Sequence, residues 1–187
     1  MNEKKEKKRK GRYSYLNDFK LNEQNEYEYR GNVYAVDLPG EQKKKLLRSV
    51  LFLLAECAGL ILLAGIVPFE GLMNTFYVII PYITEIGFAG FLISAVGTVY
   101  RNDELREYVY QKSAGRLGVY GPGLLGTSIV RLAASLLYLL INGIGKPLSA
   151  AIYFLITLLL IVLEIKAVQS VMALKYRLVR EKKTENQ

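Results

Sequence analysis

The sequence predicts an all-α membrane protein, a four-transmembrane-helix bundle with a small cytoplasmic N-terminal β-hairpin. Three observations support this fold class. The 187 residues are 51% apolar and 22% charged, and the two classes are segregated along the chain. Four apolar stretches are each long enough to cross a bilayer core of about 30 Å, which takes roughly 20 helical residues. Residues 13–40 instead alternate polar and apolar side chains around turn signals, which is typical of short strands.

The N-terminal segments are expected to lie outside the bilayer. Residues 1–12 are mostly basic with no apolar periodicity, which predicts a disordered basic tail. They do not resemble a signal peptide, because the first long apolar run begins only at Leu46. Residues 13–40 predict a β-hairpin segment. We expect it to dock on the bundle or on a partner, since isolated hairpins are marginally stable.

The transmembrane domain is expected over residues 41–174, with spans at about 46–67, 72–99, 124–141 and 147–172. Proline and glycine turns separate the first two spans and end the third. Between the second and third spans, residues 101–118 predict a short helix at the membrane interface, which Gly121-Pro122-Gly123 ends. Residues 175–187 are expected to form a basic cytoplasmic tail.

The distribution of basic residues predicts the orientation. Twelve Lys and Arg precede Leu46, four lie in residues 101–118 and five follow Leu174, whereas Lys146 is the single basic residue in the two remaining turns. Because cytoplasmic segments carry the excess of Lys and Arg, both termini are expected in the cytoplasm. The absence of Trp and the abundance of Lys and Tyr suggest a bacterial source, so the predicted location is the cytoplasmic (inner) membrane.

Composition excludes several kinds of chemistry. The chain has no histidine and one cysteine, Cys57, so the commonest general base, metal ligands and disulfides are missing. We therefore expect no enzyme, no cofactor and no metal site. The formal charge of +8 is compatible with nucleic acid, but the basic residues flank the apolar runs. Anionic lipid headgroups are the expected partner, and nucleic acid is not.

Four charged residues fall inside the predicted spans: Glu56, Glu85, Arg131 and Glu164. At 1.5 Å per residue, Glu56, Glu85 and Arg131 lie about 17–20 Å from the outer turns, close to the bilayer midplane. Glu164 lies roughly 6–8 Å nearer the cytoplasm. Each such charge costs about 2.5–3.5 kcal/mol on insertion and so requires a partner or a function.

Helical periodicity places polar residues beside these charges. On the third span, Arg131 shares a stripe with Ser128, Ser135 and Tyr138. On the fourth, Tyr153 shares a stripe with Glu164, and on the second, Asn74 shares a face with Glu85. The opposite face of the second span carries only small side chains, at Gly87, Gly90, Ser94 and Gly97. Small side chains let another helix approach closely, so we expect the second span to be packed on both sides.

Two interpretations of these polar residues remain open. In the first, Arg131 neutralises Glu56 or Glu85 and the stripes join helices. In the second, a spare carboxylate binds a proton or cation along a wet path. They correspond to two functional hypotheses. The first is an accessory, regulatory or scaffold subunit with a membrane-protein partner. The second is a small proton- or cation-coupled transporter or ion-conducting homo-oligomer that uses Glu56, Glu85 and Arg131. No residue pattern names a substrate.

Overall fold

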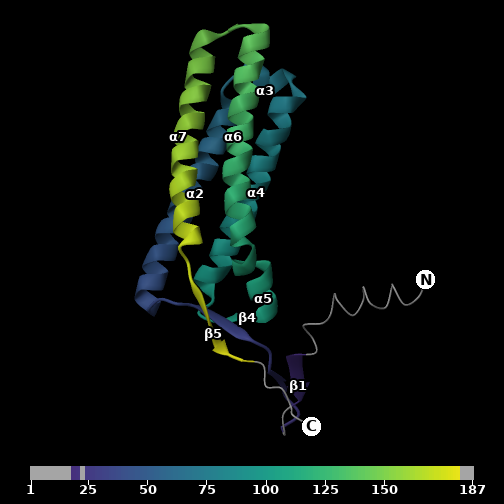
Figure 1. Ribbon diagram of the computed structural model, residues 1–187, viewed down its shortest axis with the longest axis vertical. Helices are drawn as coiled ribbons and strands as arrows, with labels where there is room; N and C mark the ends of the chain where they lie inside the picture. The colour runs from purple at the N-terminus through teal and green to yellow at the C-terminus, as the bar shows by residue number, and fades with distance from the viewer. Residues whose placement is uncertain (1–17, 22–23, 182–187) are drawn as a thin grey trace, which may run out of the picture.

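The computed structural model, described here for residues 18–21 and 24–181, is dominated by four long helices (Figure 1). They are α2 (Gly40–Ile66), α4 (Phe76–Arg101), α6 (Leu117–Asn142) and α7 (Pro147–Met172). Helix α2 packs on α4 and α7, and α6 packs on the same two helices, so the four form a closed ring. All four are long and apolar enough to cross a membrane.

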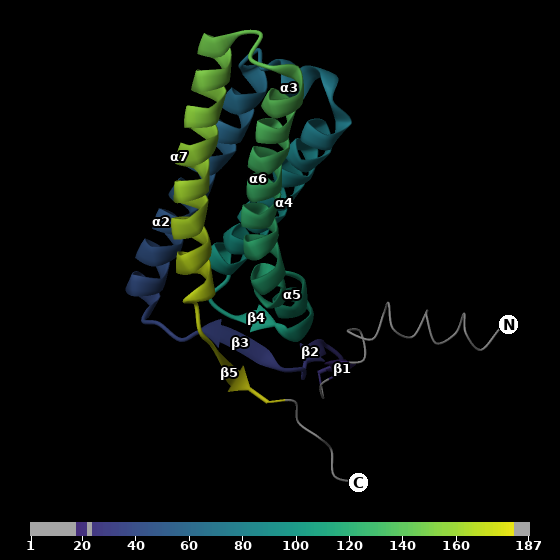
Figure 2. The same cartoon turned by 45° about the horizontal axis from the view of Figure 1, so that its top comes forward.

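The two ends of the bundle differ. Short connections join α2 to α4, through the one-turn helix α3 (Glu70–Asn74), and α6 to α7; we call this the turn end. At the other end, which we call the sheet end, lie all the strands together with α5 (Glu107–Lys112) and the 3-10 turn η2 (Ala114–Arg116) (Figure 2). The first and last described segments of the chain both lie at the sheet end.

Each helix turns a narrow face inward and leaves a broad apolar face outward. In α2 the buried positions follow a helical period: Leu47, Val50, Leu54, Cys57, Ile61 and Ala64. The opposite face carries apolar side chains in the open, among them Phe52, which is 71% exposed, and Ile66, which is 75% exposed. A bundle that is apolar on its outer surface is suited to a lipid environment.

The helix bounds differ from the predicted spans at three places. The first helix begins before 46, at Gly40, and the second predicted span is divided, because Thr75 is extended (φ −131°, ψ 123°) and separates α3 from α4. The third helix begins before 124, at Leu117, and continues through Gly121-Pro122-Gly123. Pro122 lies early in the helix and removes a single backbone hydrogen bond, a loss that membrane helices tolerate. The fourth predicted range coincides with α7.

The sheet end contains two small antiparallel sheets. β1 (Phe19–Leu21) and β2 (Tyr27–Tyr29) pair as a hairpin. β3 (Val33–Val36) does not join them: it lies between β4 (Leu105–Arg106) and β5 (Tyr176–Arg180). The second sheet therefore combines parts of the segments expected to be a hairpin, a short interfacial helix and a basic tail. Within residues 101–118, the strand β4 is followed by the short helix α5. The predicted basic tail at 1–12 lies outside the described residues.

Aromatic packing and one buried lysine attach the sheet end to the bundle. Tyr34 stacks on Tyr110 with ring centroids 4.1 Å apart, and Tyr176 meets Tyr110 edge-on at 5.4 Å. Lys43, near the start of α2, donates to the carbonyl oxygen of Asn102 (2.7 Å), the residue that follows the end of α4. Its Nζ also lies 3.3 Å from Asp103 Oδ1. These contacts hold β3, β5 and the start of α2 against the segment between α4 and α6.

Candidate functional site

A buried ion pair joins α4 to α6 near the middle of the bundle. Arg131 Nε lies 2.8 Å from Glu85 Oε2, and Arg131 Nη2 donates to Glu85 Oε1 at 3.2 Å. Both side chains are 0% exposed. The Nη2 contact is a charge-assisted hydrogen bond, whereas the shorter Nε contact is an ion pair without hydrogen-bond geometry. Of the two partners that the sequence left open for Arg131, the geometry selects Glu85.

Neighbouring polar and aromatic side chains complete the surroundings of this pair. Ser128, one turn before Arg131, donates to Glu85 Oε1 at 2.9 Å. The Arg131 guanidinium carbon lies 5.7 Å from the ring centroid of Tyr82 and 5.6 Å from that of Tyr153. Both distances fall in the range of cation–π attraction. Three helices, α4, α6 and α7, thus enclose one arginine.

Glu164 on α7 is the second buried carboxylate. It is 0% exposed, and neither of its oxygens has a hydrogen-bond partner among the described residues. Glu85 and Arg131 are close enough to act on it electrostatically, and the Ser128 hydroxyl lies nearby. Ser128 nevertheless directs its hydroxyl to Glu85 and to the Leu124 carbonyl oxygen. Arg131 Nη1 is also without a partner, so an unused donor and an unused acceptor lie in the same interior.

The remaining predicted site residues separate into inner and outer positions. Ser135 is buried and lies 3.2 Å from the hydroxyl of Tyr153. Tyr138 is buried nearer the turn end, where its ring meets Phe69 edge-on at 5.7 Å. Asn74 is exposed on α3 and does not share a face with Glu85, because the helix is interrupted at Thr75.

Glu56 does not join the other charges. It is exposed on the outer surface of α2, whereas the next residue, Cys57, is buried. No ion pair or hydrogen bond involves its carboxylate among the described residues.

The small residues of α4 do not pack against another helix of this chain: a Cβ atom added at Gly87, Gly90 or Gly97 would meet nothing within 4 Å. The expectation that both sides of the second helix are packed is therefore wrong for this chain on its own.

Sequence reasoning missed one member of the cluster, Tyr82. It precedes Glu85 by three residues, so it occupies the same helical face, and its hydroxyl donates to the Ile61 carbonyl oxygen at 3.3 Å. The three-residue spacing from Glu85 is sufficient to predict the helical face of Tyr82. The spacing does not predict its contact with α2, because that contact depends on how the helices are arranged.

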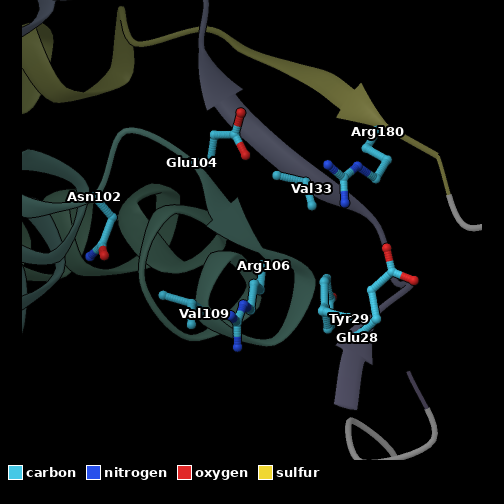
Figure 3. A pocket seen from close by; sticks show the side chains of 8 residues that line it. All are labelled: Glu28, Tyr29, Val33, Asn102, Glu104, Arg106, Val109 and Arg180. Carbon is cyan, nitrogen blue, oxygen red and sulfur yellow. The ribbon is translucent and has the colours of Figure 1, made fainter. Parts of the chain in front are cut away.

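Apart from the buried cluster, a hollow lies at the sheet end, outside the bundle (Figure 3). It has a volume of about 550 Å³ and is lined by Glu28, Tyr29, Val33, Asn102, Glu104, Arg106, Val109 and Arg180. The guanidinium carbon of Arg106 lies 5.3 Å from the ring centroid of Tyr29 and 5.5 Å from that of Phe19. Partial burial raises the pKa of the Tyr29 phenol above its ordinary value. The residues that line the hollow come from β2, β3, the loop after α4, β4, α5 and β5, so no local pattern predicts it.

The chemistry available to these sites is limited. Among residues 18–21 and 24–181, no three His, Cys, Asp or Glu side chains come together in a way that would hold a metal ion. The interior contains carboxylates, a guanidinium and hydroxyls. These groups are able to form hydrogen bonds, and the carboxylates are able to bind or release a proton. No family model, curated protein or solved structure significantly matches the chain.

Proposed function

We propose that this chain is a multi-pass protein of the bacterial cytoplasmic membrane that acts as an accessory, regulatory or scaffold subunit. One observation carries the proposal: β3, β4 and β5, which are far apart in the sequence, form one sheet at a single end of the bundle. A protein that holds distant segments in a shared surface domain has a platform on which a partner is able to dock. We refer to this second sheet and the adjoining hollow as the platform.

The platform has an open edge. The strand order is β4-β3-β5, so one edge of β5 has no neighbouring strand in the described part of the chain. Leu178 and Val179 on this strand are 46% and 48% exposed. An exposed edge strand with apolar side chains is a template for adding a strand from another chain. The platform is therefore suited to an extended segment of a partner protein.

Charge supports placing the sheet end in the cytoplasm. The exposed basic side chains near this end include Lys44, Lys45, Arg101, Arg106, Lys112, Arg116, Lys175, Arg177 and Arg180. At the turn end, Lys146 is the one basic residue of the described connections. The excess of Lys and Arg marks the cytoplasmic side. Basic residues close to the surface also attract anionic headgroups, by about 1 kcal/mol each.

The test is site-specific photocrosslinking in the membranes of the source cells, with the full chain. A photoreactive residue at Leu178 or Val179 should form a discrete adduct with another protein. The same residue at Leu140, exposed at the turn end, should not form that adduct. Val179→Asp should reduce the yield at 178 while leaving the thermal unfolding temperature unchanged. Crosslinks at 178 and 179 that contain lipid alone, or this chain alone, would reject a docking role for the platform.

The transporter hypothesis remains a second candidate because of one observation, the unpartnered buried carboxylate of Glu164. A transport site requires such a group inside the bilayer. Reconstitution into vesicles containing a pH-sensitive dye would measure proton flux under an imposed gradient. A flux that Glu164→Gln abolishes, in a protein that still folds, would favour transport. Equal flux through the variant would exclude Glu164 as the transport site, and no flux above that of empty vesicles would favour the accessory role.

A further inference from the structure

The feature that the proposed platform leaves unused is the outer face of α2. Here Glu56 borders a shallow hollow of about 480 Å³, lined by Lys45, Arg48, Ser49, Phe52, Leu53 and Glu56. We call these six residues the Glu56 face. All of them belong to α2, and the hollow opens away from α4 and α7, the two helices on which α2 packs.

The depth of Glu56 makes its exposure unusual. It precedes the last residue of α2, Ile66, by ten positions, or about 15 Å. The ion-paired Arg131 precedes the end of α6 by eleven positions, or about 16 Å. Glu56 therefore lies at the level of the buried ion pair, near the centre of a bilayer core of about 30 Å, but it faces outward. Arg48, two turns away, is about 12 Å nearer the sheet end.

A second copy of this chain does not supply the missing cation. Two copies inserted in the same direction place equal residues at equal depths, so pairing of two such faces would bring Glu56 against Glu56. The exposed basic residue of α7 is Lys166, nineteen positions into the helix and thus about 28 Å from the turn end. It lies about 13 Å too close to the sheet end to reach Glu56.

We propose that the Glu56 face binds a transmembrane helix of a different protein, one that carries a Lys or Arg at the bilayer centre. Arg48 and Lys45 continue the same face toward the sheet end, eight and eleven residues from Glu56. The partner helix therefore carries an acidic group at a matching distance, about 12–16 Å from its central cation. Phe52 and Leu53 supply apolar contact between the two charged levels. The inference adds a surface within the membrane to the proposed accessory role and does not depend on the platform.

The experiment uses the full chain in phosphatidylcholine vesicles and synthetic transmembrane peptides in place of the partner. The peptides are Leu/Ala helices that differ only in their central residue, Lys in one and Leu in the other. Energy transfer between a donor on the chain and an acceptor on the peptide measures association. The Lys peptide should associate about tenfold more tightly than the Leu peptide, since a polar contact between membrane helices commonly contributes this much.

Two variants distinguish the Glu56 face from a general effect of peptide charge. Glu56→Gln should reduce the preference for the Lys peptide to about that for the Leu peptide. Thr84→Val removes an exposed hydroxyl at a similar depth on α4 and should leave the preference unchanged. Thermal unfolding of each variant verifies that it is folded. The measurement uses no platform partner, so its outcome is separate from that of the crosslinking at β5.

Three results would overturn the proposal. Equal association of the Lys and Leu peptides would show that the face does not select a cation. Full retention of the preference in Glu56→Gln would place the binding elsewhere. Association between labelled copies of this chain that depends on Glu56, and that the Lys peptide does not displace, would make a second copy the occupant.

Discussion

At the scale of single residues, the interior of the bundle is organised around Arg131. A fully buried guanidinium is stable only when a carboxylate and further polar groups replace its hydration. Glu85 and Ser128 provide these groups from α4 and α6, and two aromatic rings face the remaining surface of the guanidinium. Removal of Arg131 or Glu85 therefore leaves the other charge buried without a partner.

The first prediction concerns this pair. Arg131→Leu should lower the free energy of unfolding by about 3–5 kcal/mol, because it leaves Glu85 charged and buried without its partner. Adding Glu85→Gln should restore part of the loss. Adding Glu56→Gln should restore none, because Glu56 lies on the outer surface. Denaturant titration in mild detergent measures all three variants, and equal rescue by the two glutamine substitutions would contradict the pairing described here.

The second prediction compares two tyrosines at the sheet end. The hydroxyl of Tyr176 is buried with no hydrogen-bond partner among the described residues, and burial raises its pKa. Tyr176→Phe should therefore stabilise the protein by about 1 kcal/mol, since it removes an unsatisfied polar group. Tyr29 is the matched control: its hydroxyl donates to Asn32 O at 3.2 Å and accepts from Glu107 N at 3.1 Å.

Tyr29→Phe should consequently destabilise the protein by about 1–2 kcal/mol, through the loss of two hydrogen bonds. Thermal unfolding of both variants in the same detergent measures the two effects, which should have opposite signs. A loss of stability in both variants would mean that the Tyr176 hydroxyl has a partner after all.

At the scale of elements, the junction between α2 and α4 depends on Lys43. Its ammonium group is buried and binds the carbonyl oxygens at the end of α4, where the helix dipole favours a positive charge. Lys43→Met should cost about 1.5–3 kcal/mol, the range for a hydrogen bond to a charged group. Lys44→Met, at an exposed neighbouring position, should be close to neutral. Similar unfolding temperatures for the two variants would argue against this junction.

The contact between α4 and α6 requires a glycine at position 123. A Cβ atom there would lie 2.5 Å from Cε1 of the Phe88 ring, closer than any real contact. Gly123→Ala should lower stability by about 1–3 kcal/mol, as expected for overpacking. Gly90→Ala, on the open face of α4, meets nothing within 4 Å and should be tolerated. If both variants unfold at the temperature of the parent, the two helices do not approach so closely.

At the scale of the whole molecule, the prediction concerns orientation. In a background with Cys57→Ser, cysteines at Asn74 and Asn142, both exposed at the turn end, should react with an impermeant thiol reagent added outside intact cells. A cysteine at Gln111, exposed on α5, should react only after the cells are opened. Gly71, at the same end, is not a suitable position, because a side chain there would collide with the rings of Phe69 and Tyr138. Labelling of 111 from outside would reverse the orientation.

Much of the architecture follows from local patterns in the sequence. Four apolar stretches, two polar turns and the position of the basic residues suffice to predict four helices with both ends of the chain on one side. The polar stripe of α6 is also local: Ser128, Arg131, Ser135 and Tyr138 recur at helical spacing, and the structure buries all four. Periodicity predicts them because it is a property of one helix about its own axis.

Tertiary structure decided how these faces are directed and which distant segments meet. Periodicity does not say which way a helix is rotated toward its neighbours, so the sequence leaves Glu56 and Glu85 as equal candidates for the partner of Arg131. In the structure, α2 directs Cys57 inward and Glu56 outward, which leaves Glu85. Strand pairing likewise depends on contacts distant in the chain. β3 bonds to β4 and β5, although its neighbours in the sequence are β2 and α2, because the packing of four helices brings those three segments to one end.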